Sequence, residues 1–374
     1  MKYYLVAGEA SGDLHGANLM KELKKLDPQA EFRFFGGDLM RAEGGTLVKH
    51  YADMAFMGFF EVVAHLRTIL KNLAFCKQDI DGYQPDVLIL IDFPGFNLKV
   101  AAFAKEQGLP VYYYISPKVW AWNQKRVLKI KKVVDHLFCI LPFEVEFYRD
   151  WGMRVDYVGN PLLDAVAAFK PDAGFRQKHN LGDRRIIALL PGSRKQEINY
   201  LLPDMLAVAD QFPEYQFVVA GAPSFSADYY QQYLKGRDIP VLFNSTYDIL
   251  TNAYAAVVAS GTATLETALF NVPQVVVYKG NPVSIGIAKM VVKIEFISLV
   301  NLIVNKGIVR ELIQQDCNPT AIGAEIELIL NNQDYRQDML VNYDVLDEKM
   351  GAPGASAKTA ALIVKYSAAK PVNR

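Results

Sequence analysis

The sequence has few residues of the kinds that form disulfides or bind metals. Its 374 residues include only three cysteines, Cys76, Cys139 and Cys317, and five histidines. No CxxC pair and no HxxxH pair occurs, which argues against a disulfide framework and a zinc site. Asp79 and Asp81 have the DxD spacing of a metal-dependent sugar-nucleotide site, but they lie in the polar tail of a predicted helix. We therefore expect a reducing, cytoplasmic location and no metal.

Net charge and long apolar runs are also missing. Lysine plus arginine equals aspartate plus glutamate, at 40 each, so no net field favours nucleic acid as a partner. No uncharged run of about 20 apolar residues is present, so no segment is predicted to span a membrane. The apolar run at 3–7 leads directly into a glycine turn, which indicates a first strand and not a signal peptide.

Short apolar runs alternate with longer helical patterns along the chain. The first series of predicted strands lies at 3–7, 32–36, 86–92, 111–116, 136–141 and 155–159. A second series begins with IIALL at 186–190, after a polar stretch at 167–185. This alternation predicts an α/β fold with two Rossmann-like domains that face a cleft. We place the domains at 1–166 and 167–344, and expect a C-terminal helix at about 345–374 to pack back on the first.

The first predicted turn, GEASGDLHG at 8–16, is rich in glycine. Its glycines are four residues apart, which is neither the GxGxxG spacing of a dinucleotide loop nor part of a Walker loop. Glu9 and Asp13 would repel a phosphate. The turn is therefore better suited to accepting hydrogen bonds from hydroxyls, although Ser11 or Asp13 as a simple cap of a helix at 14–26 is equally compatible with this stretch.

Two turns in the second half have the features of a nucleotide site. In LLPGSRKQEI, Ser193 can cap a helix that begins near Gln196, and Arg194 adds positive charge to the positive end of that helix, so we expect an anion there. In SGTATLE, small residues follow a buried strand, and Glu266 one turn later can bind the two hydroxyls of a ribose. A solvated helix start and an ordinary capped helix are the plain alternatives.

Asp92 ends the apolar strand in DVLILIDFPGFN. A carboxylate at the end of a buried strand is partly desolvated, which raises its pKa and its value as a general base. An ion-paired or helix-capping aspartate is the alternative.

The segment at 54–77 combines apolar and basic side chains. An interfacial helix that contacts a membrane through Met57, Phe59, Phe60, Arg67 and Lys71 fits this composition. A helix that packs on the core with a solvated basic side fits the periodicity equally well.

Seven motifs occur in order over almost the whole chain: GEASGD, IDFPGFN, YISPKVWAWNQKRV, LPFEVEFY, LLPGSR, SGTATLE and ISLVNLI. This ordered set resembles the lipid-A-disaccharide synthase family. The resemblance implies an inverting, metal-independent glycosyltransferase of the GT-B type without a cofactor. It would transfer 2,3-diacylglucosamine from UDP to 2,3-diacylglucosamine 1-phosphate, forming the β-1,6-linked disaccharide of lipid A and releasing UDP.

The resemblance also assigns residues by motif. It places catalysis on Asp92, with Glu9 also in the cleft. Donor binding falls on Ser193, Arg194, Gly261, Thr262, Glu266 and Asn301. For the acceptor side of the cleft we expect Ser11, Gly12, Asp13, Asn97, Trp122 and Arg126. The sequence departs from the family pattern at Gly95, Asn160 and Val300, the last of which could alter the approach of Asn301.

The resemblance implies a peripheral protein on the cytoplasmic face of the inner membrane, whose surface is anionic, and a homodimer. Two other functions remain open from the residues. A UDP-sugar 2-epimerase would use the same GT-B plan without lipid contact. A UDP-sugar-binding regulator would have lost catalysis, although intact Asp92, Arg194 and Glu266 argue against it.

Overall fold

The computed structural model describes residues 1–54, 66–281 and 295–369 and divides the chain into two compact units. Unit 1 comprises Met1–Asp164 and the C-terminal segment from Ala352, and unit 2 comprises Ala165–Gly351. We predicted that the return to the first domain begins near residue 345. Helix α18 (Gln333–Met350) remains part of unit 2, so the return begins at Ala352.

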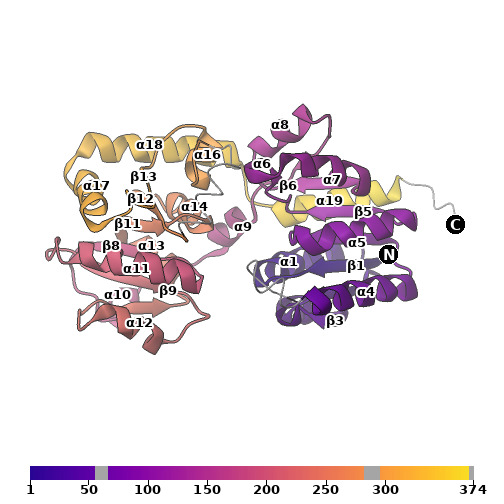
Figure 1. Ribbon diagram of the computed structural model, residues 1–374, viewed down its shortest axis with the longest axis horizontal. Coiled ribbons are helices and arrows are strands. Elements are labelled where there is room, and N and C mark those ends of the chain that lie inside the picture. The colour runs from indigo at the N-terminus through magenta and orange to yellow at the C-terminus, as the bar shows by residue number, and fades with distance from the viewer. Residues whose placement is uncertain (55–65, 282–294, 370–374) are drawn as a thin grey trace. The chain divides into compact units, whose positions relative to one another are not determined.

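Unit 1 is built on a seven-stranded parallel sheet with the order β3-β2-β1-β4-β5-β6-β7 (Figure 1). Its strands are β1 Lys2–Ala7, β2 Glu31–Gly36, β3 Thr46–His50, β4 Val87–Ile91, β5 Val111–Tyr114, β6 His136–Cys139 and β7 Asp156–Tyr157. Its helices are α1 Ala10–Leu26, α2 Asp38–Ala42, α4 Leu66–Tyr83, α5 Pro94–Glu106, α6 Val119–Trp122, α7 Val127–Val133, α8 Phe143–Asp150 and α19 Ala355–Ala368; α9 Pro161–Ala168 leads into unit 2. Strand β3 was not predicted, and α1 begins four residues earlier than expected.

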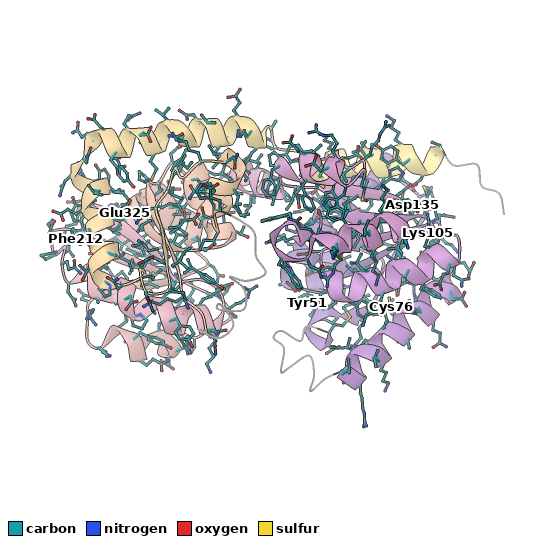
Figure 2. All side chains as sticks on the ribbon, turned by 45° about the horizontal axis from the view of Figure 1, so that its top comes forward. Tyr51, Cys76, Lys105, Asp135, Phe212 and Glu325 are labelled. Atoms are coloured by element: carbon teal, nitrogen blue, oxygen red, sulfur yellow. The ribbon has the colours of Figure 1, made fainter. Side chains whose placement is uncertain are left out.

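The sheet of unit 1 has a hydrophobic core on each face. On one face, α4, α5 and α7 cover side chains such as Tyr113, and Cys76 on α4 belongs to this core (Figure 2). On the other face, α1 packs beside α19, whose Ala360 and Ile363 are fully buried. In Figure 1, α19 is the yellow helix at the chain end and lies among the elements of unit 1.

Unit 2 repeats this plan with a six-stranded parallel sheet of order β10-β9-β8-β11-β12-β13. Its strands are β8 Ile186–Leu190, β9 Gln216–Gly221, β10 Val241–Phe243, β11 Ala253–Ala259, β12 Gln274–Tyr278 and β13 Glu311–Ile313. Its other helices are α10 Phe175–Lys178, α11 Lys195–Ala209, α12 Ala227–Leu234, α13 Thr246–Asn252, α14 Thr262–Leu269, α16 Leu299–Val304 and α17 Pro319–Asn331. Two such parallel sheets confirm the predicted α/β fold class.

Candidate functional site

Each sheet has one point where the strand order reverses, and ligands of open parallel sheets bind at the carboxyl ends of the strands beside that point. In unit 1 it lies between β1 and β4, which are followed by Glu9 and Asp92. In unit 2 it lies between β8 and β11, which are followed by the PGSR and SGT turns. The motifs singled out from sequence therefore mark the expected ligand position of each sheet.

The carboxyl group of Asp92 lies in a partly buried, charged environment at the end of β4. Burial raises the pKa of this carboxyl group to about 6, the charge of Lys118 at the N-cap of α6 opposes the rise, and the charge of Glu9 adds to it. Such a carboxyl group is ionised at neutral pH and still has a higher proton affinity than an ordinary aspartate, which suits a general base. Lys118 was not among the predicted site residues, although it lies only two residues after the predicted strand at 111–116 and could have been found by that position.

Glu9 is the N-cap residue of α1, and its side chain makes no capping hydrogen bond. Its carboxylate lies at the positive end of a 17-residue helix. Its negative charge also raises the pKa of Asp92. Ser11 lies exposed in the first turn of the same helix. Both side chains keep hydrogen-bonding capacity for a ligand.

The three glycines of GEASGDLHG serve close packing. A Cβ atom on Gly8 would lie 2.3 Å from the ring of Phe93, and one on Gly16 would lie 2.6 Å from the sulfur of Met40. A Cβ atom on Gly12 would lie 3.2 Å from the Cβ of Ala7. Gly12, which we expected on the acceptor side, is therefore a buried contact between helix and strand.

Two predicted acceptor contacts prove to be internal supports. The Asp13 carboxylate accepts hydrogen bonds from the backbone N–H groups of Gly37, Leu39 and Met40, and so caps α2 instead of α1. Asn97 is fully buried, and its Nδ2 atom lies within hydrogen-bond distance of the carbonyl oxygens of Val6, Ile91 and Asp92. These two side chains hold the loops of the site from inside unit 1, and their contact with an acceptor stays a prediction.

Trp122 and Arg126 form a pair after β5. The Trp122 side chain is 53% exposed, and the Arg126 guanidinium lies 5.2 Å from the centre of its ring. Both are free to contact an anionic or apolar ligand, so their acceptor role stays a prediction.

In unit 2, the PGSR turn already binds an anion from its own chain. The backbone N–H groups of Ser193 and Arg194 both donate to Glu197 Oε2 at 3.1 Å, and the Arg194 guanidinium lies 3.2 Å from Glu197 Oε1. Arg194, and not Ser193, is the N-cap residue, because α11 begins at Lys195. Glu197, which was not among the predicted site residues, thus binds the groups for which we expected an external anion.

Glu266 on α14 lies at the edge of a cavity. Tyr247 donates a hydrogen bond of 2.9 Å to its Oε1 atom, and burial raises the pKa of the carboxyl group. A cavity of about 330 Å³ is lined by Phe169, Asn244, Thr246, Tyr247, Asp248 and Glu266. The second oxygen of the Glu266 carboxylate can accept hydrogen bonds from neighbouring hydroxyls of a ligand. The aromatic rings of the cavity can pack against the ring that carries those hydroxyls.

Gly261 and Thr262 lie exposed at the start of α14, next to Ser260. The Ser260 hydroxyl donates to the carbonyl oxygen of Ile297 at 3.0 Å, which ties this turn to the segment before α16. Backbone groups at this helix start are accessible to a ligand.

Asn301 is 1% exposed, and its amide is fully engaged inside unit 2. Its Oδ1 atom accepts from the N–H groups of Ile308 and Val309, and its Nδ2 atom donates to Val309 and Glu311. An amide has no further hydrogen-bonding capacity, so in this conformation Asn301 supports the loop, and its role in donor binding stays a prediction.

No group of His, Cys, Asp and Glu side chains suited to a metal ion occurs among the described residues. The DxD pair shows why spacing alone misleads. Asp79 accepts hydrogen bonds from Tyr4 and Arg33 at 2.6–2.8 Å, which makes it part of the support of unit 1.

Comparison with known proteins identifies relatives over nearly the whole chain. A family model described as lipid-A-disaccharide synthetase matches residues 3–364. The lipid-A-disaccharide synthase of Syntrophus aciditrophicus is 42% identical over 366 residues, with 96% of each chain covered. That of Nitrosococcus oceani is 40% identical over 367 residues, with 96% of this chain and 95% of the relative covered.

Among solved structures, the UDP-GlcNAc 2-epimerase of Neisseria meningitidis bound to UDP-GlcNAc has a TM-score of 0.69. The alignment covers 98% of this chain and 100% of that chain at 12% sequence identity. At this identity the likeness is one of fold alone.

Proposed function

We propose a substrate and a mechanism from the premise that the chain belongs to the lipid-A-disaccharide synthase family and is a GT-B glycosyltransferase of lipid A synthesis. The donor is UDP-2,3-diacylglucosamine and the acceptor is 2,3-diacylglucosamine 1-phosphate. The products are the β-1,6-linked disaccharide and UDP. The observation that carries the mechanism is Asp92, a carboxylate with raised proton affinity at the switch point of its sheet.

In this mechanism Asp92 takes the proton from the 6-hydroxyl group of the acceptor. The oxygen forms a bond to C1 of the donor sugar while the bond from C1 to the diphosphate oxygen breaks on the opposite face, so the configuration inverts. Glu9, whose charge acts on Asp92, and Ser11 in the first turn of α1 both keep free side chains and orient acceptor hydroxyls. Trp122 and Arg126 are proposed to contact the acceptor, whose phosphate suits the guanidinium.

Unit 2 supplies groups for the departing UDP. Glu266 accepts hydrogen bonds from the ribose hydroxyls in the cavity beside Tyr247. Gly261 and Thr262 offer backbone groups near the diphosphate, and Ser193 offers its exposed hydroxyl group. Arg194 neutralises the charge that develops on the diphosphate. Because Arg194 is paired with Glu197, its guanidinium must exchange one anion for another when the diphosphate binds.

The proposed reaction is tested with purified protein, UDP-2,3-diacylglucosamine and 2,3-diacylglucosamine 1-phosphate in detergent micelles. We expect equimolar UDP and a product with the mass of the joined disaccharide monophosphate. The matched control uses UDP-GlcNAc without acyl chains and without acceptor. A 2-epimerase would convert this control substrate to its C2 epimer, which would contradict the proposal, as would the absence of disaccharide.

For location, we propose peripheral binding to the anionic cytoplasmic surface of the inner membrane. No helix in the described part of the chain is long and apolar enough to cross a membrane. On α4, Leu66 and Leu70 are about half exposed, at 48% and 50%, next to the exposed cations Arg67 and Lys71. Paired apolar and basic side chains suit the boundary of an anionic bilayer. Met57, Phe59 and Phe60 lie outside the described residues, and a homodimer stays a prediction from the resemblance.

The double variant Leu66→Ser/Leu70→Ser is expected to bind anionic liposomes about tenfold more weakly or worse. Full burial of one leucine is worth about 1.5–3 kcal/mol, and these two side chains would insert only in part. Sedimentation with vesicles of phosphatidylglycerol and phosphatidylethanolamine measures the partition. Val341→Ser/Val345→Ser on α18, an exposed pair at the same spacing, is the control. Equal partition of both variants would remove α4 from the membrane contact.

A further inference from the structure

The backbone at the end of β4 has a costly conformation. Asp92 and Phe93 have φ angles of +43° and +48°, and neither is a glycine. In this left-handed region the Cβ atom lies too close to the backbone, so residues other than glycine rarely adopt it. A strained pair of this kind persists only where the surroundings hold it in place, and here it carries the side chain of the proposed base.

Two buried side chains hold the carbonyl group between these residues. The oxygen of Asp92 lies 2.8 Å from Asn97 Nδ2 and 2.5 Å from the Tyr113 hydroxyl, which donates to it. Tyr113 and Asn97 are both fully buried. A carbonyl oxygen has two lone pairs, and with both engaged the peptide plane of Asp92 and Phe93 resists rotation.

A third contact holds the other end of the turn. The ring of Phe93 lies so close to Gly8 that any Cβ atom there would overlap it at 2.3 Å. The same ring packs on Phe96 with centroids 5.6 Å apart. The first glycine of GEASGD therefore leaves room for the ring that follows the proposed base.

We propose that Tyr113 is a positioning residue: together with Asn97 it clamps the Asp92 carbonyl group, so that the strained turn aims the Asp92 carboxylate at the acceptor hydroxyl. This inference rests on the proposed role of Asp92. The charged groups that act on the Asp92 carboxylate are Glu9 at the N-cap of α1 and Lys118 at the N-cap of α6, and neither contributes to the clamp. The clamp acts on the direction of the carboxylate and not on substrate affinity.

The neighbouring tyrosine offers a matched control. Tyr112 lies on the same strand, is equally buried and also makes one hydroxyl contact, to Ser367 at 3.1 Å. Because successive side chains of a strand point to opposite faces, Tyr112 belongs to the core on the other face of the sheet. Both Tyr→Phe variants remove one hydroxyl group and no carbon.

Steady-state kinetics of Tyr113→Phe test the inference. We expect kcat to fall at least tenfold, because a small displacement of a reacting group strongly lowers the rate of the chemical step. KM for both substrates and the Kd for UDP are expected to stay within about twofold, whereas Tyr112→Phe keeps the kcat of the unmodified protein. Thermal melting of both variants reports whether each one folds.

If Tyr113→Phe and Tyr112→Phe have equal kcat values and Asp92→Asn is inactive, the proposed clamp is wrong and the proposed base stands. A fall in kcat that appears equally in Tyr112→Phe, in step with its melting temperature, would also overturn the clamp, since the effect would then be one of stability. An active Asp92→Asn variant would instead overturn the proposed base. The failures of the two proposals are thus distinguishable.

Discussion

Asp92→Asn is expected to lower kcat about 10²–10⁴-fold, the usual contribution of a general base. Asparagine has nearly the same shape as aspartate but cannot take a proton. The Kd for UDP should stay within about twofold, because the proposed nucleotide contacts all lie in unit 2. Product formation by mass spectrometry gives kcat, and calorimetric titration gives the Kd.

The pH profile of the unmodified protein provides a second readout for Asp92. A base works in its deprotonated form, so kcat/KM should rise with pH up to the pKa of about 6 and level off above it. This acidic limb should be absent from the residual activity of Asp92→Asn. The control is Asp38→Asn, which alters an exposed carboxylate on α2 of the same unit. This variant should retain both the activity and the acidic limb of the pH profile. More than a tenth of the normal kcat in Asp92→Asn would exclude Asp92 as the base.

Arg194→Ala is expected to lower kcat/KM about 10²–10³-fold, as the loss of one group that stabilises developing negative charge does. The change should leave α11 intact, because the cap uses the backbone N–H groups of Ser193 and Arg194, which alanine retains. Arg194→Lys should recover part of the loss, since lysine keeps the charge but not the two-pronged geometry.

Lys195→Ala is the matched control for Arg194. Lys195 is the next residue along the chain, is also exposed and carries the same charge. If both alanine variants lose the same modest activity, the turn contributes only general positive charge. The specific assignment of the diphosphate to Arg194 would then be wrong.

The sequence predicted the elements that depend on local pattern. Continuous apolar runs, such as that of β4, identified both parallel sheets, and the fold class is confirmed. Strand β3 was missed because it lies at a sheet edge, where its side chains are only partly buried and show no apolar run. The start of α1 was misplaced because glycine and serine are poor helix formers, whereas packing of Gly12 on Ala7 favours a helix from Ala10.

Local sequence pattern also explains why some candidate site residues could be placed at strand ends, whereas the contacts of others could not be predicted. Asp92, Arg194 and Glu266 were found because each follows a strand that is visible in the sequence. Asp13, Asn97 and Asn301 were also predicted to face a ligand, but the structure engages them internally. Asp13 bonds to residues 24–27 positions away and Asn97 to one 91 positions away, distances over which sequence pattern says nothing.

The family, its glycosyltransferase activity and the strands that carry the proposed base and the proposed nucleotide contacts were all predictable from the sequence, because ordered motifs and apolar periodicity are local properties of a chain. Which polar side chains remain free for a ligand depends on the three-dimensional fold. It assigned Glu197 to the PGSR turn, Tyr247 to Glu266, and Asn97 and Tyr113 to the Asp92 carbonyl group. A buried polar group must find a hydrogen-bond partner, and folding can bring that partner from a distant part of the chain.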